Sequence, residues 1–445
     1  MQRLLLGTAF FLSACLDPAT EAEPASPGAG LGPFPSTYSA PASPSTLITG
    51  ATVYDGLGSV FTDADVFIRD GRIVEVGESL DVEADRVIDG TNRTVTPGII
   101  DVHSHLGNYP TPSINAHEDG NEVTSPITSQ VSAEHGVWPQ DPGFDHALAG
   151  GVTTLHILPG SANLFGGRGV TLRNVASRTV QGMKFPGAPY TLKMACGENP
   201  KRVYGDKGGP GSRMGNVAGY RQNWIRAQSY NPDDGRDLQL ETLKGVLDGE
   251  ILVQMHCYRA DEMAQILDLA DEFDYKVHTF HHAVEAYKIG DLLREADTCA
   301  AVWADWYGFK AEAYDAIREN LPYLHAQGAC AMIHSDDPKG VQRLNQEVAK
   351  AWSDGIDAGL DISKAEAVTW MTSNPAKAIG IDDETGSLEA GKRADVVIWN
   401  GDPFSTYTRA DTVMIDGAVV YDREEGLVPR SDFRVGQDSF PEASR

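Results

Sequence analysis

The chain has 445 residues, of which 41% are hydrophobic and 22% are charged, so it can bury a large apolar core. Its 36 Lys and Arg and 63 Asp and Glu residues give a formal charge of −27 at pH 7. A surface of this sign repels phosphate backbones and anionic lipid headgroups. These values exclude a disulfide-stapled miniprotein and a disordered chain, and they argue against nucleic-acid binding.

The N-terminus has the pattern of an export signal. A short basic start is followed by an apolar stretch over residues 4–12 and by small residues just before Cys15. This pattern resembles a bacterial lipoprotein signal peptide over residues 1–14, cleaved before Cys15 so that lipid is attached to its thiol. The protein is then exported and anchored to a bacterial membrane, and in a Gram-negative cell Leu16 favours the outer membrane. A signal cut elsewhere and a core helix are the alternatives.

The segment after the export signal, residues 15–45, is rich in Pro, Ala, Ser, Thr and Gly. Such a segment buries too little surface to offset its conformational entropy, so we expect a flexible tether. Four further cysteines match no zinc-finger or CxxC spacing, and the sequence selects no disulfide among them. They are Cys196, Cys257, Cys299 and Cys330.

Two β-rich pieces lie at opposite ends of the remaining chain. Residues 46–97 contain short strand-like runs and an Asp-Gly hairpin signal at positions 70–71. Residues 386–425 contain similar runs and a second Asp-Gly pair at positions 416–417. Because the two ends of a domain commonly lie close together, we expect these pieces to form one composite β-sandwich, followed by a tail over residues 426–445.

Between these pieces, residues 98–385 alternate strand-like apolar runs with stretches of helix length, as repeated βα units do. Eight parallel strands with intervening helices close into a (β/α)8 barrel of the α/β class, whose reactive residues lie at the C-terminal ends of the strands. Residues 107–150 and 197–216 are expected to form loops over that mouth. The eight expected strands are residues 99–105, 151–158, 169–175, 190–195, 251–257, 276–282, 300–306 and 330–336.

Histidines and one acid fall where several of these strands are expected to end. His103 and His105 flank one residue at the end of the first strand, and side chains two apart on a strand point to the same side. Both imidazoles therefore face the barrel mouth, where they can bind one metal ion. The other residues of metal-ligating type at strand ends are His256, His282 and Asp336. Their convergence predicts a metal site at the mouth.

With these residues in place, the sequence over residues 46–422 resembles the amidohydrolase superfamily of metal-dependent hydrolases, in its imidazolonepropionase-like and prolidase-like branch. The superfamily combines a barrel with a composite β-sandwich, which agrees with the fold expected above. Its motifs leave the substrate open. The matching strings are Thr96-Pro97-Gly98-Ile99-Ile100-Asp101-Val102-His103-Ser104-His105, Ser335-Asp336, Asn374-Pro375-Ala376 and residues 386–395.

The resemblance implies two divalent metal ions, with zinc as the expected metal. It places a bridging ligand on the fourth strand, where Lys193 is the candidate after its amine takes up CO2 as a carbamate. An unmodified ammonium would be repelled by two cations, so the alternatives are a Lys193 that points elsewhere, with Glu198 as the bridge or with no bridge. The implied ligands are His103, His105 and Asp336 for one ion and His256 and His282 for the other.

The sixth strand holds three histidines. Alternation places His278 and His282 on one side of the strand and His281 on the barrel exterior, unless a bulge intervenes. His282 also matches the family position, so we assign it as the ligand and expect His278 in the barrel core or next to the ligands. The other histidines lack a converging position and are expected at the surface or in packing; they are His117, His135, His146, His156, His325 and His334.

Two strings are candidates for the wall of a substrate pocket, with loop packing as the alternative. Residues 163–168 contain glycines that permit close backbone approach, and residues 303–310 contain aromatic groups that supply apolar walls. Further candidates for binding a substrate carboxylate are Arg168, Arg213 and Tyr287.

These features predict a metal-dependent amidohydrolase that cleaves a C–N bond of a small molecule, namely a peptide-like compound, an N-acyl amino acid or a cyclic amide. Asp336, as the catalytic residue, accepts a proton from the attacking water and passes it to the leaving nitrogen. The alternatives are a mononuclear imidazolonepropionase-like hydrolase or deaminase and a non-catalytic surface lipoprotein. The sequence leaves a homo-oligomer open.

Overall fold

The computed structural model describes residues 34–427. The predicted signal peptide over residues 1–14, the lipidation candidate Cys15 and most of the predicted tether and tail lie outside this range. Among the helices of the described range, none has the length and apolar character needed to cross a membrane.

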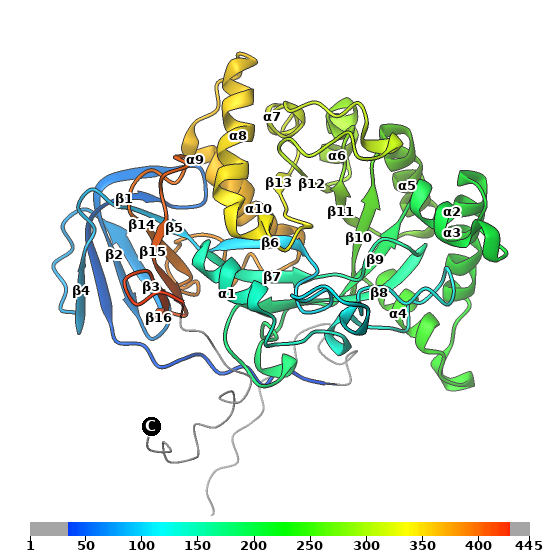
Figure 1. Cartoon of the computed structure of the whole chain (residues 1–445), viewed down its shortest axis with the longest axis horizontal. Coiled ribbons are helices and arrows are strands. Elements are labelled where there is room, and N and C mark those ends of the chain that lie inside the picture. The colour runs from blue at the N-terminus through cyan, green and yellow to red at the C-terminus, as the bar shows by residue number, and fades with distance from the viewer. Residues whose placement is uncertain (1–33, 428–445) are drawn as a thin grey trace, which may run out of the picture.

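One of two eight-stranded sheets forms a barrel whose strands stand in chain order (Figure 1). Each strand coincides with one of the eight runs expected from the sequence, and the apolar side chains between strands and helices make the main core. The α/β barrel fold is therefore confirmed. The strands are β6 (Ile99–Ser104), β7 (Val152–Ile157), β8 (Phe165–Arg173), β9 (Thr191–Ala195), β10 (Leu252–Cys257), β11 (Val277–His282), β12 (Cys299–Val302) and β13 (Ala331–Ile333).

The expectation that all eight strands are parallel is wrong for β8, which is antiparallel to both β7 and β9. A parallel connection needs a crossover of about a dozen residues or more, usually with a helix. The connection over residues 158–164 is too short for that, so the chain turns back as a hairpin. Residues 174–190, on the other side of β8, hold only the 3-10 helix η4 (Val180–Gly182).

The two end strands of the barrel sheet, β6 and β13, are joined by the residues that follow β13. The backbone N–H of Asp336 donates to the carbonyl of His103 at 3.0 Å. The backbone N–H of Ser335 donates to the carboxylate of Asp101 at 3.1 Å, and its hydroxyl donates to the same carboxylate. Barrel closure therefore fixes Asp336 beside the first pair of predicted ligands.

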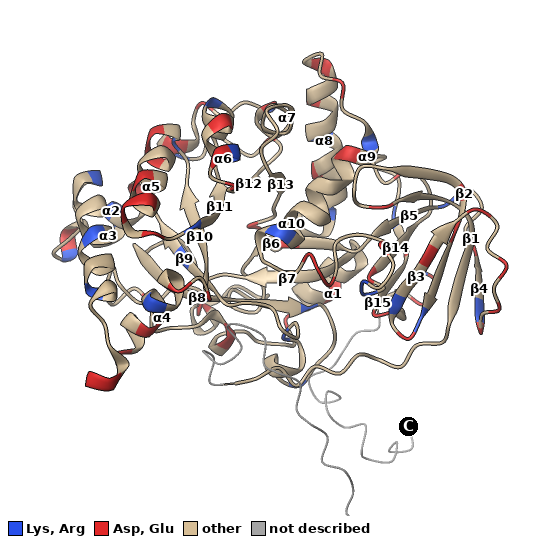
Figure 2. Cartoon of the chain, turned by 180° about the vertical axis from the view of Figure 1, so that it is seen from behind, with Lys and Arg blue, Asp and Glu red and all other residues tan. Residues whose placement is uncertain are grey.

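Helices cover the outside of the barrel. Helix α5 (Ala260–Phe273) shows why these segments pack there, because it buries Met263, Ile266 and Phe273 at helical spacing. Its acidic residues other than Glu262 are exposed, namely Asp261, Asp268, Asp271 and Glu272. Acidic residues are spread over the helices and the sheet edges rather than gathered in one place (Figure 2). The other helices are α1 (Pro142–Ala149), α2 (Glu198–Tyr204), α3 (Arg213–Gln228), α4 (Leu238–Leu247), α6 (Gly290–Glu295), α7 (Asn320–Ala326), α8 (Leu344–Asp357), α9 (Lys364–Val368) and α10 (Ser373–Ala378). Of these, α3 and α4 also contact β8, through Tyr220 and Trp224 against Phe165 and through Thr242 against Arg168.

Short 3-10 helices complete the connections of the described chain. Besides η4 they are η2 (Asn115–His117), η3 (Ala133–His135), η5 (Gly205–Lys207), η6 (Pro232–Asp234), η7 (Ala286–Ile289), η8 (Ala311–Ala313), η9 (Gly340–Arg343) and η10 (Thr369–Met371).

The second sheet draws its strands from both ends of the chain, as predicted. Its order is β16-β15-β14-β5-β1-β2-β3, with β4 also paired to β1, and it surrounds a separate apolar core. Strand β5 joins the N-terminal and C-terminal pieces, because it pairs with β1 in parallel and with β14 in antiparallel orientation. The strands are β1 (Thr46–Tyr54), β2 (Val60–Arg69), β3 (Arg72–Gly77), β4 (Arg86–Asp89), β5 (Thr94–Pro97), β14 (Val396–Trp399), β15 (Ala410–Ile415) and β16 (Ala418–Asp422).

A buried ion-pair cluster connects the barrel to the second sheet. Arg173, the last residue of β8, has no exposed side-chain surface and donates two hydrogen bonds to Asp395. Its guanidinium also lies 3.3 Å from Asp416, which accepts a hydrogen bond from Tyr38. Burial disfavours the charged form of Asp395, but Arg173 outweighs it and holds the pKa of that carboxyl below its usual value.

Candidate metal centre

A cavity of about 840 Å³ opens at the mouth of the barrel, between the loops that follow β6, β9, β10 and β12. The structure brings four of the six predicted ligands to its wall, namely His105, His256, His282 and Asp336. The other two, His103 and Lys193, are fully buried in contact with this group. All six predicted ligands therefore meet at one place.

The first three predicted ligands form a compact group. Oδ1 of Asp336 lies 3.1 Å from Nε2 of His105 and 3.4 Å from Nε2 of His103. Nδ1 of His105 donates to the carbonyl of Leu158 at 2.8 Å, which in the neutral imidazole leaves Nε2 with a lone pair. Burial would raise the pKa of Asp336, but a proton shared with Nε2 of His105 in the metal-free site holds it below the usual value.

This group has the donors that a metal ion requires. The lone pair on Nε2 of a neutral His105 faces a carboxylate oxygen, and two acceptors at this distance attract each other only through a cation or a proton. Donor atoms of a tetrahedral zinc site with bonds of about 2.1 Å are about 3.4 Å apart, which matches the separations around Asp336. The residues therefore fit a divalent ion.

The second predicted group lies next to the first. The ring centroids of His256 and His282 are 4.6 Å apart, and those of His103 and His282 are 4.9 Å apart. Asn199 donates to Nε2 of His256 at 3.3 Å, while Nδ1 of His256 and Nδ1 of His282 have no hydrogen-bond partner among residues 34–427. The unpartnered Nδ1 of His282 is a candidate donor for a second ion, while Nε2 of His256 would have to exchange its contact with Asn199 for the metal.

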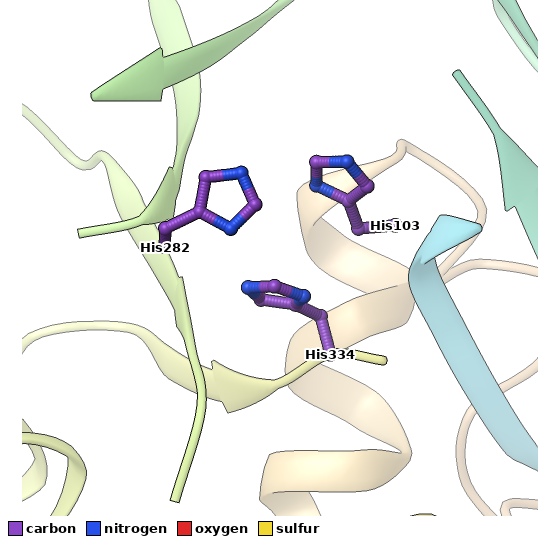
Figure 3. A group of neighbouring side chains, drawn as sticks. All are labelled: His103, His282 and His334. Carbon is purple, nitrogen blue, oxygen red and sulfur yellow. The ribbon is translucent and has the colours of Figure 1, made fainter. Parts of the chain in front are cut away.

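His334, which we expected at the surface or in packing, lies beside the predicted ligands. It is almost fully buried and forms a metal-type cluster with His103 and His282 (Figure 3). Burial lowers the pKa of His334 to about 3, so the ring is neutral. Neither of its nitrogens has a hydrogen-bond partner within the described part of the chain. The available signal was its position two residues before Asp336 within the expected strand 330–336, where side chains two apart would point the same way.

The histidines of β11 also differ from the expectation. Val253 of β10 pairs with Val277, but the next residue, Gln254, pairs with Thr279, so β11 bulges at His278. The bulge turns His278 away from the barrel interior. Its Nδ1 then accepts a hydrogen bond from the backbone N–H of Val253. It also turns His281 inward, with no exposed surface, so the prediction of an exterior His281 and an interior His278 is wrong.

His282 reaches the same side as its neighbour because the strand ends there. Its φ is 69° and that of Ala283 is 38°, so the backbone leaves the extended conformation and alternation stops. Trp303 and Tyr258 stack against the His282 ring, with centroids at 4.4 Å and 5.2 Å. These contacts hold the ring at the cavity wall.

Lys193 lies in the interior of the barrel on β9. Its Nζ is 3.2 Å from Nε2 of His103 and 3.2 Å from the carbonyl of Pro159. Burial lowers the pKa of Lys193 to about 7, so a large share of this amine is uncharged at neutral pH. An uncharged amine is the form that combines with CO2. The alternative bridge, Glu198, lines the cavity, with Oε1 at 3.6 Å from the Lys310 ammonium.

The two predicted wall strings behave differently. Asn163, in the first string, is buried and donates hydrogen bonds to Glu122, Ser125 and Thr128. This side chain therefore packs against the neighbouring loop instead of lining the cavity. In the second, Phe309 and Lys310 line the cavity. Trp306 and Phe309 remain 45% and 50% exposed, and both rings contact Trp303.

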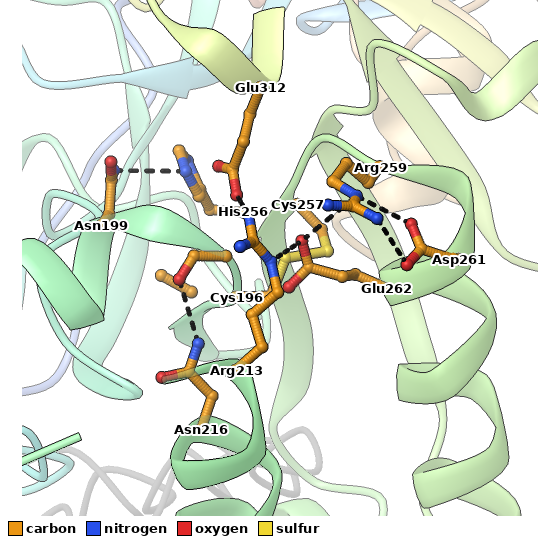
Figure 4. The surroundings of a disulfide bond; sticks show 12 residues. Cys196, Asn199, Arg213, Asn216, His256, Cys257, Arg259, Asp261, Glu262 and Glu312 are labelled. Carbon is orange, nitrogen blue, oxygen red and sulfur yellow. Dashed lines mark hydrogen bonds and ion pairs between the residues drawn. A yellow bond between two sulfur atoms is a disulfide. The ribbon is translucent and has the colours of Figure 1, made fainter. Parts of the chain in front are cut away.

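The three carboxylate-binding candidates are absent from the residues that line the cavity. Arg168 is buried in β8 and donates to Thr242. Tyr287 lies in η7, half buried. Arg213 pairs with Glu262 and Glu312 beside the cavity (Figure 4).

Basic residues of the cavity wall were missed in the sequence. They are Lys201 and Arg202 on α2, which join Lys310 of the predicted string 303–310 at this wall. The Lys310 ammonium lies 3.8 Å from the centre of the Tyr258 ring and donates to Asn199 at 3.2 Å. In the sequence, the only sign of such a residue was a basic side chain in a helix expected near the barrel mouth. The solvated face of an ordinary helix gives the same pattern, so this sign could not identify a cavity residue.

Two disulfides join neighbouring parts of the barrel. Cys196, directly after β9, pairs with Cys257 at the end of β10, next to His256 (Figure 4). Cys299, at the start of β12, pairs with Cys330, directly before β13. Each pair occupies corresponding positions on adjacent parallel strands, which becomes visible only when the strand order is known.

Comparison with known proteins gives consistent matches. The family model described as "Amidohydrolase family" matches residues 315–420. The crystal structure of an amidohydrolase from Thermotoga maritima MSB8 is 34% identical, with a TM-score of 0.79, and the match covers 85% of this chain and 100% of that one. Amidohydrolase tasK of Hapsidospora irregularis is 31% identical over 82% of this chain, which spans only 41% of that protein. Imidazolonepropionase of Mesorhizobium japonicum is 25% identical, with coverage of 80% and 90%.

Proposed function

The chain belongs to the amidohydrolase family and is therefore a hydrolase, and from its site we propose that it cleaves a peptide-like C–N bond at a centre of two divalent metal ions. The observation that carries the proposal is the meeting of His103, His105 and Asp336, where lone pairs face a carboxylate oxygen at 3.1 Å and 3.4 Å. A cation satisfies this arrangement. Zinc is the metal we propose, because imidazole and carboxylate donors suit it.

The second ion would be held by His256 and His282. Lys193, as a carbamate, would supply the anionic oxygen between the two ions, and its pKa of about 7 supports this modification because the reacting amine must be uncharged. When bound, such ions make water acidic enough to react at neutral pH and polarise the scissile carbonyl.

Asp336 is the residue that moves the proton. Its lowered pKa keeps the carboxylate charged at neutral pH, so it can accept the proton of the attacking water. Oδ2 of Asp336 lies 3.8 Å from His282 and faces the same cavity. The carboxylic acid then returns the proton to the leaving nitrogen, which must be protonated to depart as an amine.

The cavity wall supports a substrate that carries both a carboxylate and an apolar group. Lys310 and the α2 residues Lys201 and Arg202 bring positive charge to one wall, in a chain whose formal charge is −27. Phe309 and Trp306 offer exposed aromatic surface next to that charge. N-acyl amino acids and dipeptides combine both features.

The location that we propose is the outside of a bacterial cell membrane, with the protein held by lipid on Cys15. The two disulfides support an oxidising compartment, because such bonds are rare in the reducing cytosol.

The test uses protein purified without chelator. We expect about two equivalents of zinc per chain, by analogy with two-metal hydrolases. A panel of N-acyl amino acids, dipeptides, hydantoins and purine nucleosides then defines the reaction by amine or ammonia release. Asp336→Asn should reduce kcat by about three orders of magnitude or more, as loss of a proton-transfer group does.

The control is Asp337→Asn, because this neighbouring carboxylate caps backbone N–H groups outside the cavity, a role that Asn also fills. Ammonia release from a nucleoside without cleavage of any acyl compound would replace the proposal with a deaminase. A single ion with full activity would replace it with a mononuclear hydrolase. Equal activity of both variants would remove the proton role of Asp336.

A further inference from the structure

We propose that Gln254 and His281 form a hydrogen-bonded relay that fixes which nitrogen of His103 carries the proton, and thereby prepares His103 for metal. None of the three side chains has exposed surface. The role of the relay in metal binding rests on the proposed metal centre. The tautomer of His103, however, is a property of the metal-free protein and can be measured without metal. His281 and Gln254 are positioning residues here.

The first step is the orientation of the Gln254 amide. Its Nε2 donates to the backbone carbonyl of Ala378 at 3.0 Å. A carbonyl cannot donate, so the amide nitrogen must face Ala378. The amide oxygen Oε1 therefore faces His281, at 2.7 Å from its Nε2. The position of this amide is set by the α10 backbone.

The second step is the tautomer of His281. Because Oε1 of Gln254 only accepts, Nε2 of His281 must carry a proton and donate it. His281 is completely buried, and within the described residues its ring nitrogens hydrogen-bond only to the Gln254 amide and the His103 imidazole, neither of which is negatively charged, so the neutral ring is favoured. Its Nδ1 then has a lone pair.

The third step transfers this choice to His103. Nδ1 of His281 and Nδ1 of His103 are 3.0 Å apart, and only one proton can lie between them. Since Nδ1 of His281 accepts, Nδ1 of His103 donates, and Nε2 of His103 is left with its lone pair. That nitrogen lies toward Lys193 and Asp336, at 3.2 Å and 3.4 Å. The lone pair is therefore directed at the proposed metal.

A metal-ligating histidine usually donates its other N–H to a carboxylate, a carbonyl or water, and losing that partner costs about 10- to 100-fold in metal affinity. Here the partner is a second imidazole from another strand. Because His103 and His281 are completely buried, water cannot easily replace the missing acceptor. The bulge at His278 is what makes the relay possible, because it turns His281 inward.

The direct test is 15N NMR of the histidine rings in the metal-free protein. Wild type should show His103 protonated at Nδ1 and His281 protonated at Nε2, assigned by comparison with His103→Gln and His281→Gln. In Gln254→Met the amide acceptor is lost at nearly unchanged volume, so both rings should populate the other tautomer. A His103 ring protonated at Nε2 in wild type would overturn the relay, whether or not the protein binds zinc.

Metal affinity gives a second measurement. We expect His281→Phe and Gln254→Met to weaken zinc binding about 10- to 100-fold in chelator competition. Gln254→Glu keeps an acceptor for His281 and should stay within a few fold of wild type. A purely packing role gives the opposite order, since a buried carboxylate disturbs an apolar contact more than methionine does. That opposite order would also overturn the relay.

His146→Gln is the control, because His146 is an exposed histidine on α1, outside both the relay and the bulge of β11. It should leave zinc affinity and both tautomers unchanged. His105→Ala separates the two proposals, since it removes a proposed ligand without touching the relay. If wild type and His105→Ala bind zinc equally poorly, the metal centre fails, while the tautomers of wild type still decide the relay.

Discussion

Replacing Arg173 by Met should strongly destabilise the contact between the barrel and the second sheet. Arg173 is completely buried and donates two hydrogen bonds to Asp395, with Asp416 at 3.3 Å. Methionine retains most of the volume but leaves both carboxylates without their cation. Breaking a buried pair in this way costs about 3–5 kcal/mol, much more than an exposed pair is worth.

The pH dependence of this cost has a definite sign. In wild type, the folded-state pKa of Asp395 is lowered, so its stabilising contribution is present at neutral pH and is lost as pH falls through that value. Without Arg173, burial alone raises the folded pKa above the unfolded one. The variant's folded state then binds protons more readily, so its penalty should shrink from pH 8 towards pH 5.5.

The assay is equilibrium urea unfolding at both pH values, with reversibility checked by refolding. Arg173→Met combined with Asp395→Asn should be less destabilised than the two single variants added together, by about 2 kcal/mol or more, because the double variant no longer buries an uncompensated Asp395 charge. A cost below about 1 kcal/mol for Arg173→Met at pH 8 would refute the reasoning. So would a penalty that grows on acidification.

Further expected outcomes concern the site and the anchor. Phe309→Ala should lower kcat/KM about tenfold for substrates with a large apolar side chain and only slightly for their alanine analogues. The reason is that a substrate covering roughly half of the exposed ring area, at about 25 cal/mol per Å², gains about 1.4 kcal/mol. The control is Tyr407→Ala, at a position that is 89% exposed and outside the cavity, and it should change neither value. Lys193→Ala should bind clearly less zinc by elemental analysis, and normal zinc content with normal rate would end its assignment as the bridge. Cys257→Ser should lower the free energy of unfolding, measured in urea against the oxidised wild type, by ~2–5 kcal/mol as is typical of native disulfides, and a free energy equal to that of wild type would argue against the bond. Cys15→Ala should move the protein from the membrane to the soluble fraction, and continued membrane association would contradict the lipid anchor.

Much of the fold could be predicted because the barrel strands are apolar runs of the right length. The positions of His103, His105 and Asp336 at strand ends followed from those runs together with alternation. The direction of β8 could not be predicted, because an apolar run is the same whether the strand is parallel or antiparallel. Only the shortness of the 158–164 connection carried that information.

The inner histidines show a different limit of the sequence. A single extra residue at His278 changes which side every later residue of β11 faces. That bulge arises from pairing with β10, which is a property of the assembled sheet. His334 was overlooked because its strand end was assigned to Asp336 alone. The disulfide partners likewise depended on which strands became neighbours.

The reversed strand β8 restricts where this enzyme can acquire new substrate preferences. The tight connection before β8 uses its own backbone at the site, since the carbonyls of Leu158 and Pro159 accept hydrogen bonds from His105 and Lys193. An insertion there would displace ligands rather than reshape a pocket. Variation in specificity during evolution should therefore concentrate on the opposite rim, in the segments 197–213 and 303–314. Laboratory libraries built on this scaffold would benefit from the same restriction.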